Sequence, residues 1–152
     1  MSAKAQPTIP APNVASLPSM EHSFSVQVKG VETGLNWVGN FKYKRPSLGA
    51  RGRIDVMRAN LCGDREALLP EVIEFHEMVA YLRHTLSDYP EWWKEANFGL
   101  DLYDGNVVSE VYAKAMEFEA EWKTKVFGGD AKSVEAKSDA GDQAATAGAV
   151  SP

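Results

Sequence analysis

The chain has 152 residues, of which 44% are hydrophobic and 24% are charged, as expected for one globular domain with a single core. Its net charge of −5 argues against general nucleic-acid binding, its one cysteine (Cys62) excludes an internal disulfide, and no apolar run reaches the ~18 residues of a membrane span. Since residues 1–20 also lack the charged start and apolar stretch of a signal peptide, we expect a soluble protein of a reducing cytoplasm.

Composition changes at both ends of the chain. Residues 1–21 hold four of the eight prolines and no aromatic residue, which predicts an extended arm, because proline fixes φ and removes a hydrogen-bond donor. Residues 129–152 also lack aromatic residues and cannot bury enough apolar area to offset the entropy of ordering, which predicts a disordered tail. A single folded domain is therefore expected over 22–128.

The domain begins with the pattern of a β-hairpin. Apolar and polar residues alternate over 22–29 and again over 35–43, with a glycine-containing turn at 30–34 and Pro46 as the end of the second strand. Gly39, among aromatic residues, predicts a bulge or a close backbone approach. Because two strands alone are marginal in water, the hairpin is expected to pack on helices or on another chain.

Three helical segments follow the hairpin. The first is predicted to start after a Ser47 cap and to run to about residue 61, with Gly63 as its stop. The second is predicted over about 69–86, with Pro70 in its first turn. The third is predicted to be capped by Asp104 or Asn106 and to end at Gly128-Gly129. The predicted fold class is α+β: an antiparallel hairpin packed on about three helices.

No group of residues predicts catalysis, a cofactor or a metal. His76-Glu77 begins like a zinc-protease helix, but residue 80 is Ala where the second histidine belongs. Asp101 and Asp104 begin like a calcium loop, but the twelfth residue is Tyr112 instead of Glu. A small enzyme would need a cleft with shifted carboxylate or histidine pKa values, which sequence alone does not predict.

Charge is segregated along the chain. Residues 24–58 carry seven basic and two acidic residues, whereas residues 64–123 carry fourteen acidic and five basic ones. This arrangement either orients the protein toward an oppositely charged partner, which includes another copy of itself, or is neutralised within the fold. The basic stretch 42–58 is the one place where nucleic acid would bind, but Tyr43 belongs to the expected core face, so nucleic acid is not expected as a partner.

Aromatic residues suggest a protein-binding surface. Tyr, Trp and Arg are the residue types that anchor protein interfaces, and adjacent Trp92 and Trp93 cannot both face one core. The alternative is that these rings complete a small core. The interface candidates are Phe24, Trp37, Phe41, Tyr43, Arg45, Arg51, Trp92, Trp93 and Trp122.

Two segments resemble a known family. They are the hairpin phrase Trp37-Val-Gly-Asn-Phe-Lys-Tyr-Lys and the stretch from Trp92-Trp93 through Gly99-Leu-Asp-Leu-Tyr-Asp-Gly-Asn to Trp122. Over about residues 24–125 the chain is similar to the tail assembly chaperones of tailed bacteriophages. The resemblance implies a non-enzymatic protein that holds the tape-measure protein, or its tail-tube partners, in the host cytoplasm during assembly.

Two other functions remain open. The proline-rich arm departs from the chaperone pattern and suits a virion structural or accessory protein, such as a cement or adaptor protein, that is incorporated in the particle. An acidic inhibitor of a host protein, whose helical face mimics a nucleic-acid backbone, is the other alternative. The expected partners are phage tail or virion proteins and, as a homo-oligomer, the chain itself.

Overall fold

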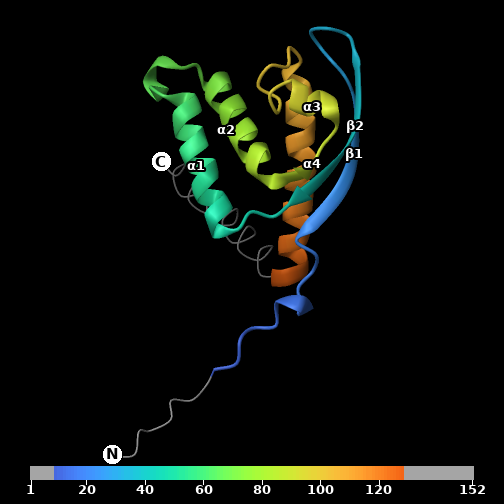
Figure 1. Cartoon of the computed structure of the whole chain (residues 1–152), viewed down its shortest axis with the longest axis vertical. Coiled ribbons are helices and arrows are strands. Elements are labelled where there is room, and N and C mark those ends of the chain that lie inside the picture. Colours follow the sequence, from blue (N-terminus) through green and yellow to red (C-terminus); the bar gives the residue numbers. More distant parts are fainter. Residues whose placement is uncertain (1–8, 129–152) are drawn as a thin grey trace, which may run out of the picture.

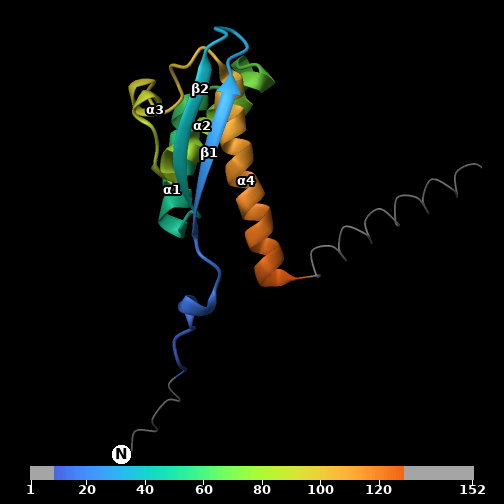
Figure 2. The same ribbon diagram turned by 90° about the vertical axis from the view of Figure 1, so that its right-hand side faces the viewer.

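A computed structural model describes residues 9–128 and shows a three-stranded antiparallel sheet with helices on one face, which confirms the predicted α+β class (Figures 1 and 2). The strand order is β1-β2-β3. In chain order the elements are the 3-10 helix η1 (Val14–Ser16), β1 (Glu21–Lys29), β2 (Asn36–Lys44), α1 (Leu48–Cys62), the 3-10 helix η2 (Arg65–Ala67), α2 (Pro70–Thr85), β3 (Leu86–Asp88), α3 (Glu91–Glu95) and α4 (Gly105–Phe127).

The β1–β2 hairpin follows the predicted alternation. Phe24 pairs with Phe41 and Val26 with Gly39, so these residues share the face that meets the helices, whereas Val38 of β2 is exposed on the other face. Gly39 marks a close backbone approach, because a Cβ there would lie 2.6 Å from Cγ of Pro90. The irregularity in strand pairing lies elsewhere, in β2 opposite β3.

The third strand was not predicted. The second helix was expected to reach Leu86, but α2 ends at Thr85 and the chain turns into the short strand β3, where Leu86 pairs with Tyr43. Leu86 is buried in this position. A buried leucine fits the apolar spacing of a helix and of a strand equally well, and three residues are too few to show a strand period.

The helix boundaries follow the predicted signals. The Ser47 side chain accepts a hydrogen bond from the Ala50 N–H at 3.2 Å, and α1 stops at Gly63, whose φ is +51°. Pro70 begins α2, and Gly128, with φ of +61°, ends α4. Start and stop residues of this kind are local, which is why the sequence predicts them well.

The helices form two layers behind the sheet. α4 packs against β1, α2 packs beside α4, and α1 packs chiefly on α2 as the outermost helix (Figure 1). The core between the sheet and the α2–α4 layer consists of Val26, Phe41, Tyr43, Val79, Leu82, Leu86, Trp93, Val108, Val111 and Ala115. Because α1 touches the rest of the domain mainly through α2, much of its surface faces outward.

The segment before β1 projects away from the body of the domain (Figures 1 and 2). It was expected to be extended throughout, but one 3-10 turn at Val14–Ser16 interrupts it. Prolines leave this turn possible because three consecutive residues, 14–16, are free of them. The predictions for residues 1–8 of the arm and for the 129–152 tail lie outside the described residues.

Candidate protein-binding surface

Four of the aromatic interface candidates lie inside the domain. Phe41, Tyr43 and Trp93 are exposed by 2% or less, and Trp122 by 6%. The rings of Phe41 and Trp93 meet edge to face at 5.4 Å between centroids, a favourable aromatic geometry. In this fold these four rings complete the core, as the alternative interpretation holds, and they offer no surface to a partner.

Three other candidates are half-buried. Trp92 lies along the edge of β2, where its ring N–H donates to the Val38 carbonyl at 3.0 Å and its ring packs 4.9 Å from that of Trp37. Phe24 stacks on Phe41 at 5.7 Å. The two adjacent tryptophans therefore do face different surroundings, with Trp93 inside and Trp92 at the strand edge.

Arg45 belongs to a polar network between β2 and α4. Its guanidinium donates to both carboxylate oxygens of Glu119, at 2.7 and 3.2 Å, and lies 3.5 Å from the centre of the Trp122 ring. The Tyr43 hydroxyl also donates to Glu119, at 2.8 Å. Burial raises the pKa of Glu119, but the hydrogen bonds from Arg45 and Tyr43 outweigh it and hold the pKa below its usual value.

Asp104 connects the β1–β2 turn to the start of α4. It was expected to cap α4, but its side chain makes no cap bond and instead accepts from the N–H groups of Glu32 and Thr33, the Thr33 hydroxyl and the Trp37 ring N–H. Burial raises the pKa of this fully buried carboxyl, but the hydrogen bonds, those from Thr33 first, outweigh burial and lower the pKa to about 2.

Asn106 completes the same connection. Its side-chain amide donates to the Lys29 carbonyl at 2.9 Å and accepts from the Val31 N–H at 3.2 Å. Both predicted cap residues of α4 thus bind the hairpin instead of the helix. Trp37 is held by this connection, so its polar atom is already paired inside the chain.

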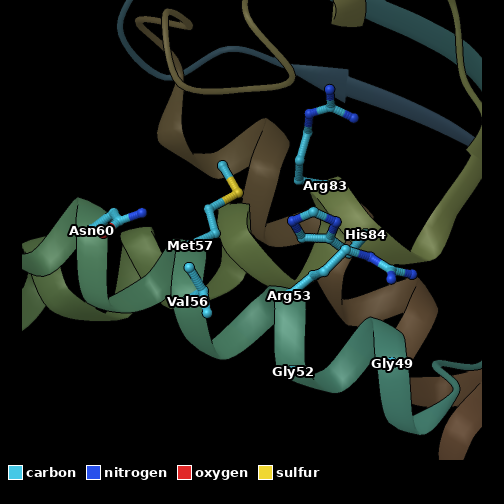
Figure 3. Close-up of a pocket in the computed structure, with 8 residues that line it drawn as sticks. All are labelled: Gly49, Gly52, Arg53, Val56, Met57, Asn60, Arg83 and His84. Carbon is cyan, nitrogen blue, oxygen red and sulfur yellow. The ribbon is translucent and has the colours of Figure 1, made fainter.

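A groove runs along the outer side of α1, where α1 meets the end of α2 (Figure 3). The α1 residues that line it recur every three or four positions and therefore share one side of the helix. Two of them are glycines, and the missing side chains leave a hollow of about 660 Å³. The lining residues are Gly49, Gly52, Arg53, Val56, Met57 and Asn60 of α1 with Arg83 and His84 of α2.

The groove is cationic as well as apolar. Its lining includes Arg53, Arg83 and His84 but no carboxylate, and Figure 3 shows Arg53 extending beside the imidazole of His84. A smaller adjoining hollow of about 290 Å³ shares Arg53 and His84 and adds Lys44, again without a carboxylate. Burial, then the charges of Arg83 and Arg53, lower the pKa of His84, as expected where positive charge is uncompensated.

Ion pairs within the domain neutralise little of this charge. Five ion pairs occur among residues 9–128, and only Arg45–Glu119 joins the basic segment 24–58 to the acidic segment 64–123. Arg51, the remaining interface candidate, is exposed on another side of α1, in a hollow of mixed charge that also contains Asp55 and Glu119. The carboxylate-free charge is concentrated at the α1–α2 groove.

Sequence reasoning did not predict the groove. In the sequence, Gly49 and Gly52 indicate only a low helix propensity in the first turn. The usable signal was the spacing of Gly49, Gly52 and Val56, which puts them on one side of the helix with Arg53. The contribution of His84 and Arg83 depends on how α2 packs against α1, which no local pattern specifies.

Within the described range of the chain, no three His, Cys, Asp or Glu side chains converge in a way that could hold a metal ion. No helix of this range is long and apolar enough to cross a bilayer. Searches against protein-family models, curated proteins and solved structures find no match for the chain.

Proposed function

We propose that the protein is a non-enzymatic assembly factor of a tailed bacteriophage, a tail assembly chaperone that binds other tail proteins in the host cytoplasm. The observation that carries the proposal is the outward side of α1. Val56, which lines a groove that the domain does not fill, is 62% exposed, and Leu48 in the first turn of α1 is 85% exposed. Exposed aliphatic residues that border a hollow are typical of a protein-binding surface.

The chemistry of the groove also favours binding. Guanidinium groups such as those of Arg53 and Arg83 hold carboxylates through paired hydrogen bonds. The groove is thus equipped to hold an anionic, partly apolar surface.

Co-expression tests this function. The tape-measure and tail-tube proteins encoded in the same phage genome would each be produced with and without the chain, and the soluble products sized by chromatography with light scattering. We expect a stable complex with one of them and a gain in its soluble yield. If every tail protein elutes apart from the chain, with unchanged solubility, the proposal is wrong.

The projecting arm favours a second candidate, a virion accessory protein. Ile9 and Val14 are 87% and 62% exposed, and the backbone hydrogen bonds of residues 12–17 stay within the arm. Apolar residues on an arm free of the body suit insertion between neighbouring subunits. Mass spectrometry of purified particles separates the two candidates, because a chaperone leaves the assembled tail and an accessory protein remains in it.

A further inference from the structure

We propose that the α1–α2 groove binds an acidic amphipathic helix of the partner protein. This inference rests on the proposed function and names the chemistry of the segment that the groove accepts. It is carried by the shape of the groove and by its charge.

The shape fits a helix. The lining residues of α1 extend from Gly49 to Asn60, about 16 Å along the axis at 1.5 Å per residue. That is three turns, the length over which a bound helix places its apolar anchors at i, i+3 or i+4, and i+7. Gly52 lets another backbone approach closely, and Val56 and Met57 supply apolar contact.

The positive charge of the groove favours a bound helix with acidic residues on both sides of its apolar stripe. Arg53 and His84 line both hollows, and Arg83 lines the larger one, with its guanidinium 3.6 Å from the centre of the Phe98 ring. Carboxylates one turn apart on a bound helix would meet the guanidinium groups of Arg53 and Arg83, with the His84 imidazole as a further hydrogen-bond partner, and the groove lining contains no carboxylate of its own.

Charge also favours a peptide over a nucleic acid. The chain has a net charge of −5, and Glu71 and Glu74 are exposed on the same helix that contributes Arg83 and His84. A long polyanion would be repelled by these surroundings, whereas a short helix with a few carboxylates would contact only the groove.

Binding is tested with synthetic peptides. The probe is a helix of about 15 residues, long enough to be partly formed in water, with leucine at the three anchor positions and glutamate on both flanks. The matched peptide has glutamine in place of every glutamate. By fluorescence anisotropy with the full chain, we expect the glutamate peptide to bind at least tenfold more tightly, and its addition to shift the amide NMR signals of Arg53, Val56 and His84.

Three variants locate the site. Arg53→Glu reverses a groove charge, and Gly52→Glu places a side chain in the groove at a position where a Cβ meets no atom within 4 Å. Both are expected to weaken peptide binding at least tenfold while the circular dichroism melt stays cooperative. Lys29→Glu makes the same charge change as Arg53→Glu at an exposed end of β1 and is expected to bind like the unaltered chain.

Four results would overturn the inference: equal binding of the two peptides, full binding by both groove variants, tighter competition by a single-stranded oligonucleotide, or a change in oligomeric state caused by the groove variants alone. If the chain still forms a complex with a tail protein under any of these results, the groove inference fails and the proposed function stands. If peptide binding behaves as expected but no tail protein is captured, the proposed function fails.

Discussion

Gly39 and Gly52 show how much the surroundings of a missing side chain matter. A Cβ at Gly39 would lie 2.6 Å from Pro90 Cγ and 3.2 Å from the Trp92 ring, whereas one at Gly52 would meet nothing within 4 Å. We expect Gly39→Ala to lower the free energy of unfolding by about 1–3 kcal/mol through overpacking. Gly52→Ala is expected to raise it by about 0.5–1 kcal/mol, because alanine favours helix.

Urea unfolding followed by circular dichroism measures both changes. The two variants add the same methyl group, so each is the control for the other. A Gly39→Ala variant as stable as the original chain would mean that β2 and the Pro90 segment do not approach as closely as described.

The hydrogen bonds that Asp104 accepts from the hairpin make the stability of the domain depend on pH in the acid range. Its pKa in the folded chain is about 2, below the ordinary value of 3.8, so its contribution to stability is complete above about pH 4 and is lost as the pH falls toward 2. Asp104→Asn removes the negative charge that the Thr33 and Trp37 donors stabilise. We expect the variant to be less stable at pH 7, with the difference from the original chain shrinking between pH 4 and pH 2.

The measurement is urea unfolding at several pH values for both proteins. Other carboxylates with lowered pKa values, such as Glu119, titrate in both and cancel in the difference. A stability difference that stays constant from pH 7 to pH 2 would contradict the assigned hydrogen bonds of Asp104.

At the scale of elements, the Arg45–Glu119 pair joins β2 to α4. The two side chains are only 14% and 12% exposed, so removal of one leaves the other charge without its partner in a largely buried place. Arg45→Met and Glu119→Leu are each expected to cost about 3–5 kcal/mol of unfolding free energy. The double variant is expected to be more stable than the sum of the two single costs implies, because no unpaired charge remains.

A double-mutant cycle in urea gives this coupling directly. The exposed pair Arg58–Asp55, within α1, provides the comparison, and its coupling is expected to be below about 1 kcal/mol. Strictly additive costs for Arg45 and Glu119 would show that the pair does not link the two elements energetically.

The elements that sequence predicts well are those with a repeating pattern and local end signals. The hairpin, α1, α2 and α4 all have them, in the form of strand alternation, the Ser47 cap or a terminal glycine. β3 has neither. The groove could not be predicted for a related reason. Glycines and arginines on an outer helix face show no apolar period, and the groove forms only because α2 places His84 beside them.

At the scale of the whole molecule, most of the predicted aromatic interface lies in the core, and other apolar residues face outward. The sequence predicted that aromatic residues form a protein-binding surface, but α2 and α4 together cover the inner face of the hairpin, and Phe41, Tyr43 and Trp93 are buried there. Residue counts give the area of rings but not the direction in which the hairpin faces. The exposed large apolar residues of the described chain are mostly aliphatic, on the arm, on the hairpin and on α1, and they also include the aromatic residues Tyr103 and Phe127.

The arm is expected to serve binding and not folding. Within residues 9–20, the hydrogen bonds that reach the body start at Pro18, whose carbonyl accepts from the Trp122 ring N–H at 3.3 Å, and at Met20, whose carbonyl accepts from the Arg45 N–H. Deletion of residues 1–17 keeps both contacts. We therefore expect the melting temperature to change by no more than about 2 °C, since no residue of 9–17 is buried.

If the arm inserts into a neighbouring protein, the same deletion is expected to weaken partner binding even though it leaves the melting temperature unchanged. Ile9→Ser/Val14→Ser removes the two most exposed aliphatic side chains of the arm while keeping its length and prolines. Co-expression with the partner, read out by sizing of the complex, is expected to show the same loss for this variant as for the deletion. A deletion that unfolds the domain would show that the arm is part of the fold, and a deletion that leaves both stability and the complex intact would confine binding to α1.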